Sequence, residues 1–224
     1  MALDVTVPQR YRDAIVSFTA GVGTTAKLFV DEQQAIGNLL GDSRLLDAVV
    51  SSTDAASKDM IVWKGRVTTR QDAALTGVMT ITATNTINRT TGSFITDGWR
   101  VGDTGMLFAP VAGAANASDG LLVIVTGVTA LALTCNTPVA LINETLLAGT
   151  RLCEIAQLFT TQIPANAGNA NAIPNVTLLN NTMDAAQDKA GMMVEADAVL
   201  ALSMAAAVAA LPARISVNGR LARY

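Results

Sequence analysis

The chain has 224 residues, of which 50% are hydrophobic and only 15% are charged, whereas about 25% of the residues in ordinary soluble domains are charged. The net charge of −3 comes from 15 basic and 18 acidic residues, so no strong positive field favours binding to nucleic acid. Histidine is absent, which excludes Ser-His-Asp and Cys-His catalysis, histidine metal sites and a histidine pH switch. We therefore predict no enzymatic activity, no cofactor and no metal site, and we expect a role in assembly.

Residues 1–60 are predicted to form a mainly helical N-terminal region after a short extended start. The first eight residues contain neither a basic segment nor an apolar one, so they do not resemble a secretory signal. From Ala26 to Leu40 the apolar residues recur at helical spacing. Ser43 is a suitable N-cap for a second, shorter helix from Arg44 to Val50.

Residues 61–160 have a different composition, in which Thr, Val, Ile and Leu dominate and glycines separate short apolar runs. This pattern is typical of short antiparallel strands separated by turns. Seven strands are expected, and together they predict a small β-barrel or β-sandwich domain. Their expected positions are 61–63, 67–69, 78–82, 104–108, 121–125, 130–134 and 151–158.

Charged residues are scarce in the second half of the chain. Between Gly120 and Asn180 there are only three, Glu144, Arg151 and Glu154. We expect part of this surface to face another subunit, because interface cores are depleted of charge. The candidate interface residues in this region are Leu146, Leu147, Ile163 and Ile173.

Cys135 and Cys153 both lie in expected strands. Two cysteines without a histidine do not make a zinc site. We expect two buried thiols, although a disulfide between neighbouring strands stays open.

Residues 161–181 are rich in small polar residues and contain two prolines, so we expect an extended loop or an arm that lies on a partner. A single helix is expected over 182–211, with Thr182 as its cap and Pro212 as its stop. The apolar stretch within it contains Glu195 and Asp197, which argues against a membrane span.

The last residues of the chain form a basic tail that completes the C-terminal region, 182–224. Its arginines, Arg214, Arg220 and Arg223, are expected to pair with acidic residues of a neighbouring chain. Ile215-Ser216-Val217 reads as a strand, and Asn218-Gly219 as a tight turn after it.

Three aspartates, Asp97, Asp103 and Asp119, lie beside or near glycines and are assigned to turns. A calcium site or a pair of glycosidase-like acids would require them to converge. No twelve-residue calcium loop is present, and nothing in the sequence supports a glycosidase pair.

The segment from Thr91 to Phe108 contains Ser93-Phe94, Asp97-Gly98-Trp99 and Gly102-Asp103, and residues 116–134 contain an Asn/Gly turn followed by two apolar strands. Together these segments resemble a small β-barrel module found in virion proteins of tailed bacteriophages. The chain departs from that module where the family often has Asn-Asn-Gly, because it has Asn116-Ala117-Ser118-Asp119-Gly120 instead.

The resemblance implies a bacteriophage virion structural protein located in the virion. The expected fold class is α+β, with an antiparallel β-barrel or sandwich flanked by N- and C-terminal helices. We expect a capsid decoration or cement protein, a homo-oligomer and by preference a trimer, that bridges subunits of the major capsid protein. A tail tube or head–tail connector subunit is the alternative, and a virion-borne glycan hydrolase is a more distant one.

Overall fold

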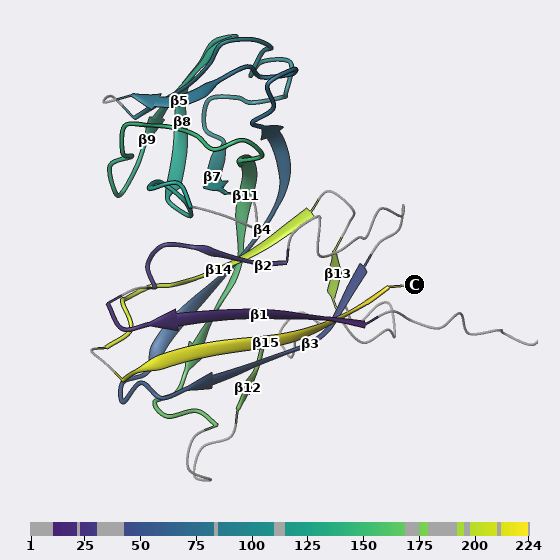
Figure 1. Cartoon of the computed structure of the whole chain (residues 1–224). Helices are drawn as coiled ribbons and strands as arrows, with labels where there is room; N and C mark the ends of the chain where they lie inside the picture. Colours follow the sequence, from purple (N-terminus) through teal and green to yellow (C-terminus); the bar gives the residue numbers. More distant parts are fainter. Residues whose placement is uncertain are drawn as a thin grey trace, which may run out of the picture. The chain divides into compact units, whose positions relative to one another are not determined.

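The computed structural model describes residues 11–21, 23–30, 43–82, 85–109, 115–168, 175–178, 192–194, 198–209 and 212–223. These residues form β-strands joined by turns, and no α-helix occurs among them (Figure 1). The strands are β1 (Tyr11–Thr19), β2 (Lys27–Val30), β3 (Ser43–Ser52), β4 (Lys58–Arg70), β5 (Met79–Thr82), β6 (Thr86–Arg89), β7 (Thr104–Phe108), β8 (Leu122–Val128), β9 (Ala132–Asn136), β10 (Glu144–Thr145), β11 (Arg151–Ile163), β12 (Val176–Thr177), β13 (Met192–Val194), β14 (Ala198–Met204) and β15 (Arg214–Arg223).

Two open sheets contain these strands. In the first, the order is β1-β15-β3-β12, and β13 also pairs with β3. In the second, the order is β10-β5-β6-β9-β8-β7-β11-β4-β14-β2. The strand pairs whose register is defined are antiparallel. Examples are β1 with β15 and β8 with β9.

The chain divides into two compact units. Unit 1 comprises residues 1–24, 29–62 and 159–224, and unit 2 comprises residues 25–28 and 63–158. The long strands β4 and β11 each contribute one part to unit 1 and the other part to unit 2.

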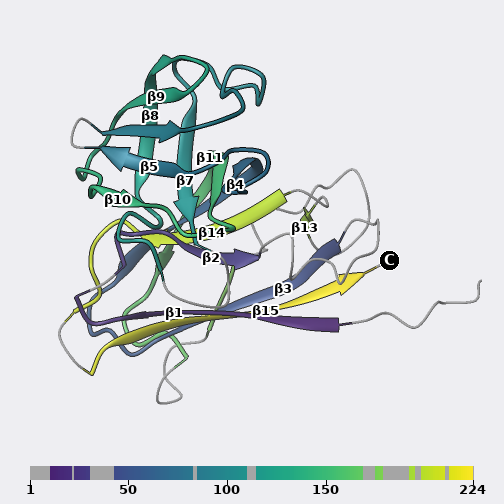
Figure 2. The same cartoon turned by 45° about the horizontal axis from the view of Figure 1, so that its top comes forward.

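The core of unit 1 lies against the sheet in which β15 runs between β1 and β3 (Figure 2). In β1, the side chains of Ala14, Val16 and Phe18 are buried, whereas Ile15 and Thr19 are exposed. This alternation has the period of two that a half-buried strand requires.

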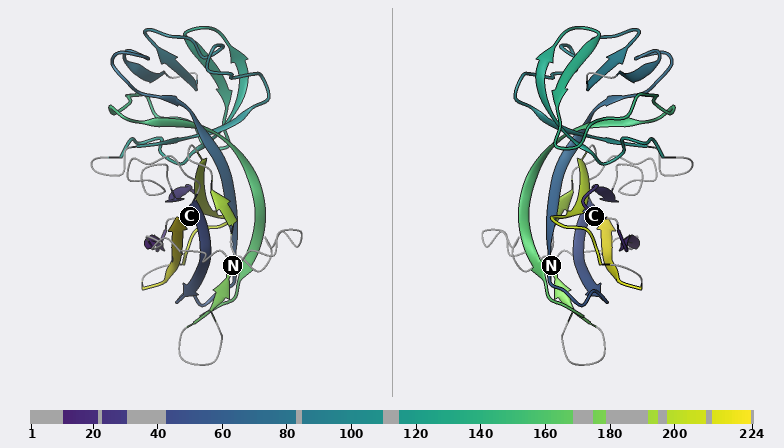
Figure 3. Two further views of the ribbon diagram at one scale, coloured as in Figure 1. Left: turned by 90° about the vertical axis from the view of Figure 1, so that its right-hand side faces the viewer. Right: turned by 90° about the vertical axis from the view of Figure 1, so that its left-hand side faces the viewer.

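Unit 2 has its own core, and Figure 3 shows the blue, teal and green strands of this unit from two sides. Inward residues of β5, β6, β8 and β9 supply much of it, including Ile87, Val123 and Leu133. Phe94 and Trp99, which come from the segment between β6 and β7, fill the same core.

The predicted α+β class is wrong, because the described residues contain no flanking helices and neither sheet closes into a barrel. The expected helix over 26–40 begins with strand β2, and residues 31–40 lie outside the described part of the chain. The expected helix over 182–211 contains strands β13 and β14, while residues 182–191 and 195–197 lie outside the description.

A β-bulge explains why residues 44–50 resemble a helix in sequence. They belong to β3, which pairs with β15 along its length, and the register shifts where Leu221 follows Arg220. The extra residue breaks the period of two, so buried Leu45 and Ala48 are three positions apart, as on a helix face.

Strand β14 resembled a helix for another reason. All seven of its residues are buried, and a continuous apolar run does not distinguish a buried strand from a buried helix. Asn218-Gly219 does not form the expected turn either, because both residues lie inside β15 and pair with β1 and with β3.

The strands expected between residues 61 and 158 are present, although 61–63 and 67–69 belong to the single strand β4. The expected loop over 161–181 begins later than predicted, because β11 extends to Ile163. Residues 164–168 form a turn, β12 follows at Val176–Thr177, and residues 169–174 lie outside the description. Among the described residues, no helix has the length and apolar character needed to cross a bilayer.

Candidate functional site

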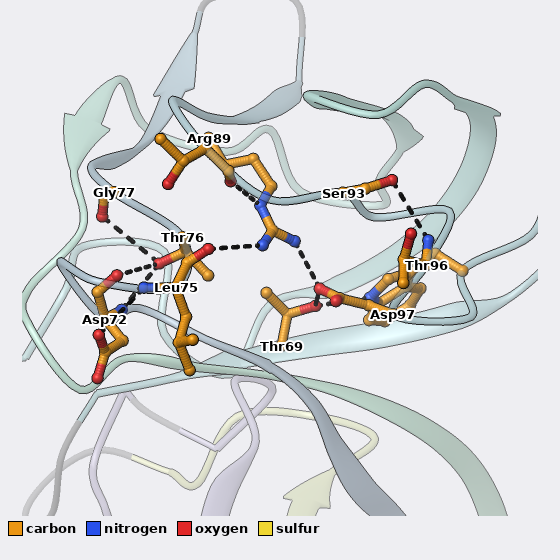
Figure 4. Close-up of polar contacts among 11 residues, drawn as sticks. Thr69, Asp72, Leu75, Thr76, Gly77, Arg89, Ser93, Thr96 and Asp97 are labelled. Atoms are coloured by element: carbon orange, nitrogen blue, oxygen red, sulfur yellow. Dashed lines mark hydrogen bonds and ion pairs between the residues drawn. The ribbon is translucent and has the colours of Figure 1, made fainter.

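A buried ion pair organises the segment between β6 and β7 (Figure 4). The guanidinium of Arg89, whose side chain is 3% exposed, pairs with the carboxylate of Asp97. The Thr69 hydroxyl donates to Asp97 Oδ2 at 2.6 Å and accepts a hydrogen bond from Trp99 Nε1 at 3.1 Å. Strand β4 supplies Thr69, and Arg89 ends β6, so the network fixes the 93–99 turn to two strands.

The remaining donors of Arg89 also have partners. Its Nε donates to the Thr91 carbonyl at 2.6 Å, its Nη2 lies 3.4 Å from the Leu75 carbonyl oxygen, and its guanidinium lies 4.9 Å from the centre of the Phe94 ring. A buried cation is tolerated when it is paired and hydrogen-bonded in this way. The function of this cluster is therefore to hold the loop in place.

The other two candidate aspartates hold turns of their own. Asp103 Oδ2 accepts the backbone N–H of Arg100 at 2.7 Å. Asp119 accepts hydrogen bonds from the backbone and side chain of Asn116 at 2.9 and 3.0 Å. Burial raises the pKa of Asp119 above its ordinary value, although these hydrogen bonds act in the opposite direction.

Glu144 lies close enough to Asp119 to raise its pKa further, but its carboxylate is engaged elsewhere. It accepts the backbone N–H groups of Ala117 and Ser118, each at 2.8 Å. Within the described ranges, no three acidic or cysteine side chains gather in a way that could hold a metal ion. Asp97, Asp103 and Asp119 are thus turn residues, as the sequence predicted.

A different feature of unit 2 is the outward side of β5, β6, β8 and β9. In each of these strands, buried residues alternate with residues that are half-buried or exposed. We call the outward set the threonine face, since five of its ten residues are threonine and none is charged. Its members are Thr80, Thr82, Thr86, Asn88, Leu122, Ile124, Thr126, Ala132, Thr134 and Asn136.

The strand register aligns these residues in rows across the sheet. One row runs from Thr82 through Thr86 to Thr134, which lie directly opposite one another on β5, β6 and β9. The Asn88 amide donates to the Thr82 hydroxyl at 3.2 Å, and the Thr126 hydroxyl donates to the Thr134 carbonyl at 3.1 Å. Part of the polar surface is therefore already satisfied within the sheet.

Such a face can be removed from water at low cost. Burying a charge is expensive unless it is paired, whereas hydroxyl and amide groups need only a hydrogen bond. The face also exposes Ile124, whose side chain is 40% exposed. The arrangement suits contact with another protein surface.

The predicted interface residues lie in different environments. Leu146 and Ile163 are 3% and 1% exposed and belong to the cores of units 2 and 1, so they offer no surface to a partner in the folded chain. Leu147 is half-buried. Ile173 lies outside the described residues.

Of the predicted arginines, Arg214 is exposed at the start of β15, where its Nη2 donates to the Ser17 hydroxyl at 2.7 Å. Arg220 and Arg223 lie near the other end of β15, and their side chains are outside the description. The role of these arginines between subunits stays a prediction.

Both cysteines are buried and no disulfide joins them. Burial raises the pKa of the Cys135 thiol to about 12, so this thiol is protonated and unreactive at neutral pH.

Sequence reasoning missed the threonine face as a site. The signal was present, because threonine or asparagine occupies every second position from 80 to 88 and also positions 134 and 136. The pairing that aligns those positions across four strands could not be predicted from the sequence. Comparison with protein families, with curated proteins and with solved structures finds no match in any of the three.

Proposed function

We propose that this chain is a structural subunit of a bacteriophage virion, namely a decoration or cement protein that binds to the outside of the head. The threonine face is the observation that carries the proposal. A cement protein acts through many modest contacts repeated by symmetry, and it needs a surface that loses water cheaply.

The composition of the chain supports the same reading. Charged residues make up only 15% of it, and the mean hydropathy is +0.39. The sequence that resembles the virion module contributes the loop held by Arg89 and the hairpin of β8 and β9. That hairpin supplies six of the ten residues of the threonine face.

Three other roles predict different results. A tail tube or connector subunit would be found in the tail or at the neck of the particle. A glycan hydrolase requires acids that converge, and in the described residues Asp97, Asp103 and Asp119 each hold a separate turn. We therefore place the hydrolase behind both structural roles.

Antibody labelling of intact phage particles in negative-stain electron microscopy tests the proposed location. Labels distributed over the head are the expected result. Labels confined to the tail or the neck would replace the cement role by a tube or connector role, and particles without label would overturn the virion proposal.

The contact itself can be tested with two charge substitutions. Thr134→Lys adds a charge in the middle of the threonine face, whereas Ser57→Lys adds the same charge on an exposed turn of unit 1. Co-sedimentation with empty phage heads should weaken at least about tenfold for Thr134→Lys, because an unpaired charge must be desolvated. Equal binding by both variants would exclude the threonine face as the contact.

A further inference from the structure

Three segments that connect strands of unit 2 lie side by side and expose apolar side chains. They are residues 71–78, 90–98 and 129–131. The Thr90 N–H donates to the Val78 carbonyl at 3.1 Å, which joins the first segment to the second. The Phe94 N–H donates to the Ala130 carbonyl at 2.9 Å, which joins the second segment to the third. We call their large exposed apolar residues the apolar patch, namely Leu75, Val78, Ile95 and Leu131, which are 69, 48, 60 and 46% exposed.

The surroundings of the apolar patch are free of exposed charge. The exposed residues next to it in the three segments are mostly alanine and threonine, namely Ala73, Ala74, Thr90, Thr91, Thr129 and Ala130. The acids of the segments are half-buried and engaged. Asp97 pairs with Arg89, and Asp72 accepts the Ala74 N–H at 2.7 Å. Interfaces between identical chains are more apolar than contacts with other proteins, so this composition favours a second copy as the partner.

The Arg89 network holds the segments of the patch in one conformation. Figure 4 shows Arg89 between the 71–78 segment and the turn that contains Ser93 and Asp97. Gly92, whose φ is +77°, packs so closely that a Cβ atom there would collide with the Arg89 guanidinium and the Leu75 carbonyl oxygen. Because the segments are already fixed, association does not have to order them, and this lowers its entropic cost.

The exposed area is large enough for a contact between two copies. Together, the four residues expose on the order of 400 Å², which is the size of functional patches on soluble monomers. With the alanine and threonine neighbours included, two copies would bury on the order of 1,200 Å² in total, the lower limit of standard specific interfaces. Apolar residues scattered singly over a surface need no partner, but these four adjoin one another.

We propose that the apolar patch of unit 2 binds the same patch of a second copy of this chain. A contact between identical patches has a two-fold axis, so its product is a dimer. The trimer expected from the sequence would require a different contact. A membrane surface is a poorer partner, because peripheral membrane sites carry several lysines or arginines beside their apolar residues.

This inference goes beyond the proposed function, because it adds a contact between copies to the contact with the head. The four residues of the apolar patch are not members of the threonine face. In unit 2, the uncharged polar face would therefore serve the head, and the apolar patch would serve the second copy.

Analytical ultracentrifugation of the full chain measures the association. Ile95→Glu places a charge from each copy in a desolvated contact and should raise the dimer dissociation constant at least about tenfold. Leu75→Glu should act in the same direction. Ile15→Glu is the matched control, because Ile15 is 65% exposed but belongs to unit 1, and it should leave the constant unchanged.

Circular dichroism and the fluorescence of Trp99 check that these variants keep their fold, which is expected because the substituted side chains are exposed. Salt then separates an apolar contact from an ionic one. A dimer held by the apolar patch should persist at high salt, since it contains no exposed charges to be screened. Dissociation by salt would point to the arginines near the C-terminus instead and would exclude the patch.

A wild-type chain that stays monomeric at high micromolar concentration would overturn the proposal, as would equal weakening by Ile95→Glu and Ile15→Glu. A trimer in place of a dimer would exclude the two-fold arrangement. Binding of a monomeric chain to phosphatidylcholine vesicles, lost in Ile95→Glu, would assign the patch to a membrane. These outcomes are independent of the particle labelling, so the contact can fail while the virion role stands.

Discussion

Unit 1 and unit 2 are both β-structures, but their ladders join residues at very different separations in the sequence. In unit 2, hairpins such as β5 with β6 and β8 with β9 pair strands that are adjacent along the chain. In unit 1, β15 lies between β1 and β3, so its ladder joins Tyr11 to Ala222. Unit 2 can therefore form from local contacts, whereas unit 1 requires both ends of the chain.

The largest expected effect would separate the two units. Val217 is fully buried in β15, opposite Val16 on one side and Val50 on the other. Val217→Asp should cost at least about 4 kcal/mol, because it buries an unpaired carboxylate in the middle of the sheet. Circular dichroism should show the loss of unit 1, while the fluorescence of buried Trp99 should still report a folded unit 2.

Asn218→Asp is the control for this experiment, because Asn218 is the exposed neighbour on the same strand. It should change stability by less than about 0.5 kcal/mol. Simultaneous loss of both signals in Val217→Asp would mean that the two units fold as one.

A substitution in unit 2 tests the opposite case, in which unit 2 is destabilised. Arg89→Met keeps an apolar stem but removes the cation from Asp97 and from the carbonyls of Thr91 and Leu75. Breaking a buried pair should cost about 3 kcal/mol in unit 2. Urea unfolding monitored by Trp99 fluorescence measures this loss, and a change below about 1 kcal/mol would show that the ion pair does not hold the loop.

A smaller effect is expected from Thr69→Val, which retains the shape of a side chain that is 3% exposed. It removes the hydroxyl that accepts from Trp99 and donates to Asp97. Leaving both groups without this partner should cost about 2 kcal/mol. The Trp99 emission maximum and the urea midpoint should shift together, and an unchanged midpoint would contradict the assignment.

The smallest effect concerns the pH dependence of unit 2. Burial raises the pKa of Asp119 in the folded chain, so the folded state binds more protons than the unfolded state above about pH 4. Stability from this group therefore falls as pH rises through the interval between the two pKa values. Asp119→Asn should gain stability relative to the wild type over that interval in urea titrations, and a parallel pH profile would exclude the effect.

Unit 2 could be predicted from the sequence better than unit 1. Most strands of unit 2 could be predicted because Val, Ile and Thr alternate between Asp-Gly and Gly-Asp turns. The pairs β5 with β6, β7 with β8 and β8 with β9 also join strands that are consecutive in the sequence. The three aspartates were correctly assigned to turns from their neighbouring glycines. The Arg89 network was not foreseen, because Thr69 and Asp97 are separated by 28 residues.

Unit 1 was misread because its signals are ambiguous at short range. The bulge in β3 gives Leu45 and Ala48 a helical spacing, and β14 is apolar at nearly every position. Only the partners of these segments settle their conformation, and those partners lie far away in the sequence. The threonine face was not predicted for a related reason, because its residues come together only when four strands are paired in register.

The central position of β15 has a consequence during synthesis on the ribosome. Strands β1 and β3 both depend on β15 as their common partner, and it is translated after the rest of that sheet. Until it leaves the exit tunnel, the nascent polypeptide carries two apolar strands that expose their edges, a state prone to aggregation. A premature stop codon before Arg214 would make that state permanent, so truncated products should be found with chaperones or in inclusion bodies.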